Sequence, residues 1–532
     1  MKTIFYNGQV YTGNWPLVTA FAVEGDKFTF AGNDSDALAL AGAEDKRVDL
    51  RGQFVCAGFN DSHMHLLSLG LALRRARLNE HTGSLAGLIE YFRDFAKNGP
   101  NERGWIVGRG WNQDNFTDVS RMPNRYDLDQ VSREYPVAAV RCCGHCAVVN
   151  SKAIELLGVT AATKPRGAGA IGVENGEPDG RFYEEAMDMI WADMPEVGVD
   201  DVKDMIRAAC VRYNACGVTS CQTDDYATDW RIVNEAYREL IESGELTVRV
   251  TEQCNFHDVK GLAEFIDAGN APGSGDTRFR VGPLKMVADG SLGSRTAFMS
   301  RPYADDPTTR GVAVYSQETL DEMIGYAHGH GMPAAIHAIG DACLDRVLNA
   351  VEKAQAALPR EDCRHGVVHC QITRRDQLER MARLKMHIYA QTIFLDYDSR
   401  IVRARVGDMA DTSYSWKTLM DMGLTVSNGT DCPVELPDAL RGIQCAVTRA
   451  PLAGGDAYLP HEAFTVREAL DSYTSAGARA SFEETIKGRI EPGMLADFVV
   501  LGQNPFTVPA DDISRIPVRE TWLGGERVYR AE

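Results

Sequence analysis

Apolar and polar positions follow two repeating patterns between residues 200 and 431. Short apolar runs recur, and the segments between most of them place an apolar residue at every third or fourth position. The runs are typical of buried parallel strands, and the intervening segments are typical of amphipathic helices. With one further run near residue 55, eight strands are expected: Phe54–Phe59, Gly217–Gln222, Thr247–Asn255, Arg280–Asp289, Met332–Ile339, Cys363–Ile372, His387–Thr392 and Thr425–Asp431. This alternation predicts the α/β class and a (β/α)8 TIM-like barrel, with a doubly wound sheet as the structural alternative.

The two ends of the chain carry short strand patterns without helices between them. Strands are expected near the start, as at Thr3–Tyr6 and Ala20–Val23, and near the end, as at Asp497–Leu501 and Val518–Leu523. A single sheet of this size buries itself poorly. We therefore predict one small β-sandwich to which both termini contribute.

The stretch between the first barrel strand and residue 200 is irregular. It contains a helical pattern at Leu85–Lys97 and a strand pattern at Pro136–Arg141. It is too long for a loop, so we interpret it as an inserted α/β subdomain. The predicted boundaries are 1–56 with 483–532 for the β-sandwich, 57–72 with 200–482 for the barrel, and 73–199 for the inserted subdomain.

Composition narrows the class of protein. The 532 residues are 44% hydrophobic and 25% charged, with a net charge of −19. The sequence has no Lys/Arg-rich run that would indicate binding to nucleic acid. No apolar run approaches the ~20 residues of a membrane span. The first residues lack the apolar segment of a signal peptide, and thirteen scattered cysteines suggest reduced thiols. We expect a cytoplasmic protein with a small-molecule substrate, and a homodimer is compatible with such a fold.

Several predicted barrel strands end on residues that bind metals. Catalytic groups of such barrels lie at the C-terminal ends of the strands. His63 and His65 are two positions apart and can face the same side, while His337, His369 and Asp431 end later strands. Any one of them alone would be read as structural, but the ordered set predicts one site. Imidazole and carboxylate groups suit a divalent metal, with zinc as the expected ion.

Lys285 lies on the fourth predicted strand and has a different chemistry. An ammonium group has no lone pair and cannot bind a metal. A neutral amine can add carbon dioxide, and the resulting carbamate offers two oxygens that could bridge two ions. The alternative is an ion pair with Asp289 or another carboxylate. The sequence therefore leaves open one or two ions per chain.

Motifs spread along nearly the whole chain resemble a known family. They are Gly58–His65, Gly108–Asn112, Asp289–Ala297, Ile336–Asp341 and Gly493–Asp497. The set is similar to that of the amidohydrolase superfamily, and within it to the YtcJ-like branch (amidohydrolase family 3), which includes N-substituted formamide deformylases. The resemblance implies a metal-bearing barrel, a sandwich from both termini and an insertion after the first strand. It implies metal ligands at His63, His65, His337, His369 and Asp431, and a carbamylated bridge at Lys285.

The expected reaction is hydrolysis of a C–N bond in an amide or N-substituted formamide. A divalent metal lowers the pKa of bound water towards ~7 and supplies hydroxide to attack the carbonyl. Asp431 is the candidate to accept the proton and pass it to the leaving group, and its alternative is a ligand without a proton role. Other possible reactions are ring opening of a cyclic amide and deamination. A non-catalytic regulatory protein on the same fold is disfavoured by the complete set of six ligand-type residues.

Four further residues are candidates for substrate binding. His145, in the inserted subdomain, either contacts substrate or is a structural hydrogen-bonded histidine. Trp111 either walls an apolar pocket or belongs to a core. Asp289 and Arg295 either join the site or shape the loop after the fourth strand.

Overall fold

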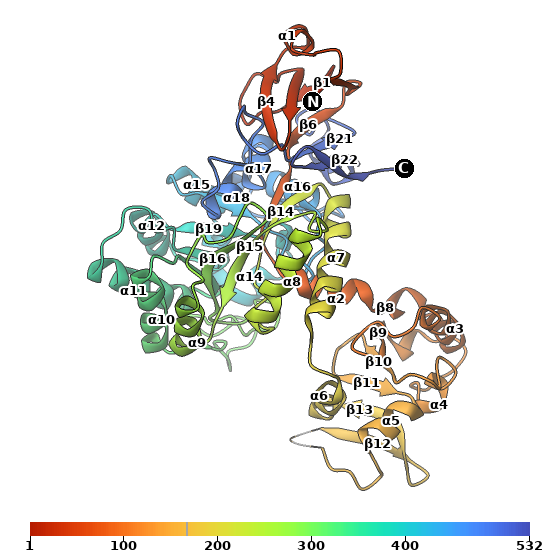
Figure 1. Ribbon diagram of the computed structural model, residues 1–532. Helices are drawn as coiled ribbons and strands as arrows, with labels where there is room; N and C mark the ends of the chain where they lie inside the picture. Colours follow the sequence, from red (N-terminus) through yellow and green to blue (C-terminus); the bar gives the residue numbers. More distant parts are fainter. Residues whose placement is uncertain (166, 168) are drawn as a thin grey trace. The chain divides into compact units, whose positions relative to one another are not determined.

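The chain folds into two compact units in the computed structural model, which describes residues 1–165, 167 and 169–532 (Figure 1). One unit comprises Met1–Leu66 and Cys210–Glu532, and the other comprises Leu67–Ala209. The second unit extends a few residues beyond the predicted 73–199 at each end. The reason is that the helices leading into and out of it pack together, and a Cβ on Gly70 would lie only 2.0 Å from the Met205 carbonyl oxygen.

Eight parallel strands in the first unit form the predicted barrel sheet. Their order is β20-β19-β18-β17-β16-β15-β14-β7. At the two ends of this sheet, the Asp431 N–H donates to the His63 carbonyl at 2.9 Å and the His65 N–H donates to the Cys432 carbonyl at 2.8 Å. The strands are β7 (Phe59–Met64), β14 (Val218–Thr223), β15 (Arg249–Asn255), β16 (Phe279–Val287), β17 (Ala334–Ala338), β18 (Gly366–His369), β19 (His387–Ala390) and β20 (Val426–Asn428). The prediction of a (β/α)8 barrel is confirmed.

The first barrel strand differs from the prediction. Phe54–Ala57 forms β6, which belongs to a sheet near the termini, and the barrel strand β7 begins at Phe59. The two apolar strands follow each other with only Gly58 between them. A side chain at Gly58 would lie 2.2 Å from the Thr219 hydroxyl oxygen, so the chain passes here in tight contact with β14. Two strands in succession therefore looked like one apolar run.

Amphipathic helices connect the barrel strands. In α8, Asp229 caps the N-terminus, and Val233, Ala236, Tyr237 and Leu240 form the buried stripe expected of a helix packed on a sheet. The helices of this part are α7 (Val199–Ala215), α8 (Trp230–Glu242), α9 (Val259–Asp267), α10 (Gln317–Gly329), α11 (Asp341–Ala357), α12 (Arg375–Leu384), α13 (Leu395–Asp398), α14 (Val402–Val406), α15 (Trp416–Asp421), α16 (Ala439–Thr448), α17 (Val466–Ser472) and α18 (Ser475–Ala480). None of the described helices is long and apolar enough to cross a membrane.

Both termini build two small sheets, as predicted. Phe5 stacks on Phe21, and Phe498 from the other end of the chain packs against both rings and stacks on Trp522. One sheet has the order β4-β3-β1-β5, and the other has the order β2-β6-β21-β22-β23. Their bounds are β1 (Lys2–Tyr6), β2 (Gln9–Val10), β3 (Ala20–Glu24), β4 (Lys27–Gly32), β5 (Lys46–Asp49), β21 (Phe498–Leu501), β22 (Val518–Leu523) and β23 (Glu526–Arg530), with α1 at Asp34–Ala39.

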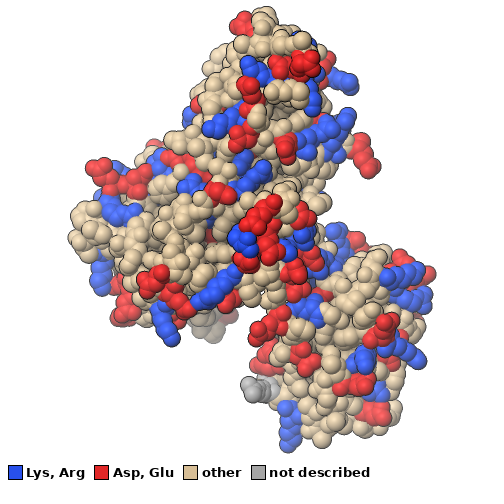
Figure 2. All heavy atoms as spheres, in the orientation of Figure 1, with Lys and Arg blue, Asp and Glu red and all other residues tan. Residues whose placement is uncertain are grey.

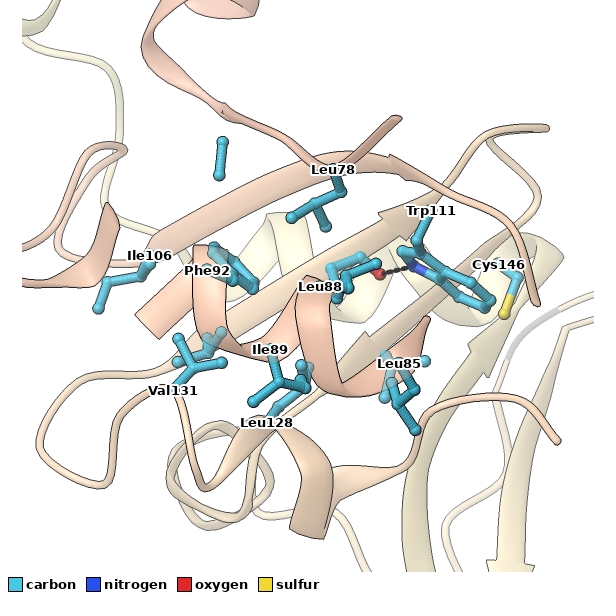
Figure 3. Close-up of a cluster of buried hydrophobic side chains, with 14 residues drawn as sticks. Leu78, Leu85, Leu88, Ile89, Phe92, Ile106, Trp111, Leu128, Val131 and Cys146 are labelled. Carbon is cyan, nitrogen blue, oxygen red and sulfur yellow. Dashed lines mark hydrogen bonds between the residues drawn. The ribbon is translucent and has the colours of Figure 1, made fainter. Parts of the chain in front are cut away.

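The unit Leu67–Ala209 has its own six-stranded sheet, ordered β12-β13-β11-β10-β9-β8. The strands are β8 (Ala76–Arg77), β9 (Ile106–Trp111), β10 (Val137–Arg141), β11 (Cys146–Val149), β12 (Ala170–Glu174) and β13 (Glu177–Tyr183). The helices are α2 (Leu66–Arg74), α3 (Leu85–Ala96), α4 (Arg125–Leu128), α5 (Ser151–Leu157) and α6 (Asp188–Asp193). One of its cores joins Leu88 and Phe92 of α3 to Ile106 and Trp111 of β9 (Figure 3).

Candidate metal centre

The ends of β7 and β20 bring three predicted ligands together. His63 lies in β7, His65 follows that strand, and Asp431 follows β20. Oδ1 of Asp431 lies 3.0 Å from Nε2 of His65 and 3.4 Å from Nε2 of His63. Potential ligand atoms of all three side chains lie within 4.8 Å of one another. One ion at this position would meet two imidazoles and a carboxylate, which are donors typical of zinc and similar metals.

His337 and His369 complete the group of imidazoles. His337 lies in β17 and His369 ends β18, and their ring centroids are 4.4 Å apart. The ring of His369 lies 5.8 Å from that of His63. Among the described residues, Nδ1 of His337 and Nδ1 of His369 are buried without a hydrogen-bond partner. Buried polar atoms are usually paired, so these nitrogens fit a site that binds a ligand, and the donor set fits a divalent metal.

The backbone at two of the ligands is unusual. His369 has φ 76° and Asp431 has φ 56°, both in the left-handed region that residues with a Cβ seldom adopt. Such conformations persist where the surroundings enforce them, and they concentrate at functional sites. At Asp431, the backbone hydrogen bond to His63 across the sheet provides that constraint.

Two side chains that the sequence analysis missed orient the first histidines. Gln253 on β15 contacts Nδ1 of His63 through Oε1 at 2.8 Å, which leaves Nε2 of His63 facing Asp431. Asp224, just after β14, contacts Nδ1 of His65, and its Oδ2 accepts a hydrogen bond from Nζ of Lys285 at 3.0 Å. Metal-binding histidines commonly use their second nitrogen in this way. Lys285 is 1% exposed, so its ion pair with Asp224 is buried.

Charge favours a cation at this position. Burial lowers the pKa of His369 well below its ordinary value, and burial together with Lys285 lowers that of His63. Burial opposes ionisation of Asp431, but hydrogen bonds from His63 and His65 hold its pKa well below the usual range. At His65 burial is outweighed by Asp224 and Asp431, which raise the pKa to about 10. The site thus pairs the neutral imidazoles of His63 and His369 with an ionised carboxylate, whereas a metal would have to displace a proton from His65.

Asp224 carried a signal in the sequence, whereas Gln253 did not. Asp224 lies two residues after the end of the predicted strand Gly217–Gln222, so the strand-end rule that selected the histidines could have selected it. Gln253 lies inside a strand, and no pattern of letters shows that its amide faces His63.

The family follows from a comparison of the whole chain with known proteins. The sequence profile of the amidohydrolase family matches residues 46–529. The chain belongs to the amidohydrolase family. This confirms the resemblance seen in the sequence.

Individual relatives cover nearly all of this amidohydrolase. The putative amidohydrolase YtcJ of Bacillus subtilis (strain 168) is 32% identical over 99% of this chain and 99% of its own length. The N-substituted formamide deformylase of Arthrobacter pascens is 24% identical over 96% of this chain and 94% of its own. The crystal structure of an uncharacterized metal-dependent hydrolase from Pyrococcus furiosus is 31% identical with a TM-score of 0.79, covering 95% of this chain and 100% of the other.

Asp289 of this amidohydrolase holds a loop beside His337. Its carboxylate accepts hydrogen bonds from the backbone N–H groups of Phe298, Ile339 and Gly340 at 2.8–3.1 Å. Its Oδ1 also lies 3.0 Å from Nδ1 of His337, outside hydrogen-bond geometry. These contacts shape the loops that follow β16 and β17, and a direct contact with substrate stays a prediction.

The other three predicted substrate residues have local partners. Arg295 forms a two-bonded ion pair with Asp305 at 2.9 and 3.0 Å. Trp111 is fully buried in the core of the unit Leu67–Ala209, and its Nε1–H donates to the Ala139 carbonyl at 2.9 Å (Figure 3). His145, in the same unit, is exposed and contacts Glu184 at 2.9 Å. Roles of these residues in substrate binding stay predictions.

A second buried cluster has metal-type side chains but no free lone pair on its rings. His328, Cys363 and His365 lie together, and His365 directly precedes β18, whereas the predicted ligand His369 ends that strand. Nδ1 of His365 accepts from the Ala334 N–H at 3.0 Å, so the proton sits on Nε2, which donates to Nδ1 of His328 at 2.8 Å. Nε2 of His328 donates to the Leu358 carbonyl at 2.7 Å. Both rings are satisfied as neutral groups, so we interpret the cluster as structural.

Buried neutral histidines predict a loss of stability in acid. Burial lowers the pKa of His365 to about 3, and burial lowers that of His387 to about 3. The unfolded chain binds a proton at each site below about pH 6.5, while the folded chain stays neutral there. The free energy of unfolding should therefore fall between about pH 6.5 and 3, by up to about 1.4 kcal/mol per pH unit per histidine. Urea unfolding at several pH values measures this slope.

The variant His387→Gln isolates the contribution of His387 to the pH dependence of the free energy of unfolding. Nε2 of His387 contacts the Ser427 hydroxyl at 2.8 Å, and glutamine in its place can keep that contact without titrating. The slope for His387→Gln should be smaller than that for the native protein by about 1.4 kcal/mol per pH unit. Equal slopes would contradict the prediction.

Proposed function

We propose that this chain is a metal-dependent hydrolase of C–N bonds, acting on an amide or N-substituted formamide. The observation that carries the proposal is the set of four imidazoles and one carboxylate at the ends of four barrel strands, of which His63, His369 and Asp431 are buried. Membership of the amidohydrolase family and similarity to metal-dependent hydrolases support hydrolysis. Similarity to an N-substituted formamide deformylase supports the choice of bond.

The proposed ligands are those predicted from the sequence. His63, His65, His337, His369 and Asp431 would hold a divalent ion, with zinc as our choice because of the nitrogen and oxygen donors. A bound divalent ion acts as a Lewis acid and makes water a stronger nucleophile at neutral pH. Lys285, as a carbamate, would add a bridge for a second ion.

Asp431 supplies the proton transfer in this proposal. His63 and His65 both contact the Asp431 side chain through its Oδ1. We propose that Oδ2 accepts a proton from the attacking water and delivers it to the leaving nitrogen, as a general base and then a general acid. Its low pKa keeps it ionised at neutral pH.

Surface charge supports a small-molecule substrate. Figure 2 shows Lys and Arg side chains interspersed with Asp and Glu on the visible face. Acidic residues outnumber basic ones, 75 to 56. A nucleic-acid partner would favour a basic stripe. We propose a cytoplasmic enzyme that binds neither nucleic acid nor a membrane and is able to form a homodimer.

Metal analysis is the first test. We expect about two ions per chain by plasma mass spectrometry if Lys285 bridges, and about one in a mononuclear site. The loaded protein should convert N-(2-phenylethyl)formamide to formate and the amine. Release of ammonia from other compounds would indicate deamination instead. Absence of metal after reconstitution with zinc or manganese would overturn the catalytic proposal.

A further inference from the structure

A buried carboxamide without a partner follows β19. Gln391 comes directly after Ala390, the last residue of that strand, and it is fully buried. Among the described residues, neither Oε1 nor Nε2 of Gln391 has a hydrogen-bond partner. Buried amides are nearly always paired in proteins, so an unpaired one points to a ligand that completes it.

The sheet places Gln391 between two of the proposed metal ligands. β19 lies between β18, which ends at His369, and β20, which leads to Asp431. Gly429, two residues before Asp431, donates its N–H to the Ala390 carbonyl at 2.9 Å. Gln391 is therefore one residue beyond the last paired position, at the end of the sheet where the ligands gather.

Strand alternation indicates the direction of the Gln391 side chain. Tyr389, two residues earlier, packs in a buried cluster with Ala335. Ala335 is two residues before His337 on β17, so these two side chains face the same side of the sheet. By the same rule Gln391 faces that side, toward which His337 also points.

An aromatic ring lies on the same turn. Phe394 is part-exposed and stacks on His369, with ring centroids 5.7 Å apart and an interplanar angle of 16°. Its N–H donates to the Gln391 carbonyl at 3.0 Å, which closes the 3-10 turn Thr392–Phe394. Asn428 on β20 holds the turn, because its Oδ1 accepts from both the N–H and the hydroxyl of Thr392 at 3.0 Å. These contacts hold the backbone of the turn that carries Gln391 and Phe394.

We infer that Gln391 and Phe394 form a substrate-binding wall for a secondary amide with a flat apolar substituent. The Nε2 donor and Oε1 acceptor of Gln391 complement the C=O and N–H of such an amide. The Phe394 ring offers an apolar face beside His369 for the substituent. This inference rests on the proposed function, because it assigns recognition at the same site.

Binding of three formamides tests the wall. The probes are N-(2-phenylethyl)formamide, its N-methyl derivative, which lacks the N–H, and N-methylformamide, which lacks the ring. Dissociation constants are measured by calorimetry on metal-loaded protein in the Asp431→Asn background, where turnover is expected to be slow. Hydrolysis of the same probes is measured separately in the native protein.

Each variant has a distinct expected result. Gln391→Met should weaken binding of N-(2-phenylethyl)formamide about tenfold and change that of the N-methyl derivative less, because the lost pairing includes the N–H. Phe394→Leu should weaken both phenylethyl probes about tenfold and leave N-methylformamide unchanged. Without probe, Gln391→Met should keep or raise the urea midpoint, since it removes an unpaired buried amide.

A matched control separates binding from structure. Gln444 is also buried, but its Oε1 accepts from the Ser514 N–H at 2.9 Å. Gln444→Met should lower the urea midpoint and leave probe binding unchanged. Unaltered binding in both wall variants, or no binding of any probe, would overturn the inference. The expected binding pattern without hydrolysis by the native protein would overturn only the proposed cleavage of formamides.

Discussion

Asp431→Asn is expected to lower kcat about 10²–10⁴-fold while the protein keeps most of its metal. Asparagine preserves the size of the side chain and one oxygen donor, and it tolerates the left-handed conformation with φ 56°. It cannot accept the proton that we assign to Oδ2. The measurement pairs kcat on the best formamide substrate with metal content per chain.

The control for this variant is the same substitution at another buried aspartate. Asp127 is 7% exposed, as is Asp431, but it lies in the unit Leu67–Ala209 and pairs with Arg121. Asp127→Asn should retain kcat and metal, with any effect confined to stability. A near-normal kcat in metal-loaded Asp431→Asn would remove the proton role and leave Asp431 as a ligand only.

The barrel and its candidate ligands were predictable because each predicted ligand ends or follows an apolar run. Parallel strands in one barrel share a direction, so their last residues converge although they are far apart in the chain. His63 and Asp431 are the clearest case, since the backbone of one bonds to the backbone of the other at the joint of the sheet. Such convergence depends on strand order and direction, which sequence patterns indicate well.

Contacts between side chains were harder to predict. The partner of Lys285 is Asp224, not Asp289, because Asp289 is occupied by three backbone N–H groups. The sequence left two interpretations of Trp111, as the wall of a pocket or as part of a core. Only the three-dimensional packing shows that it is fully buried. The division at Gly58 was also hidden, since a pattern of apolar residues does not reveal which sheet a strand joins.

Lys285→Ala distinguishes the proposed carbamate from a permanent ion pair. If the carbamate holds metal, the variant should purify with little metal, and short carboxylic acids should restore part of it by supplying the missing oxygens. If Lys285 instead stays an ammonium group, its loss leaves the buried Asp224 carboxylate with His65 as its remaining partner, which costs up to about 3–5 kcal/mol of stability. The variant would then keep its metal without added carboxylate, which would only bring a second negative charge beside Asp224.

Asp224→Asn supplies the matched comparison, alone and combined with Lys285→Ala. In the ion-pair case the double variant should be more stable than Lys285→Ala, because the buried carboxylate charge is gone. In the carbamate case Asp224→Asn alone should weaken metal binding about 10–100-fold by freeing Nδ1 of His65, and the double variant should still respond to short acids. Native protein loaded with metal in ¹³C-bicarbonate should then show a carbamate carbon by NMR. Two results would each favour the ion pair: full metal occupancy in Lys285→Ala without added acid, or no carbamate signal in the native protein. Lys285 would then stay paired with Asp224 in the working enzyme.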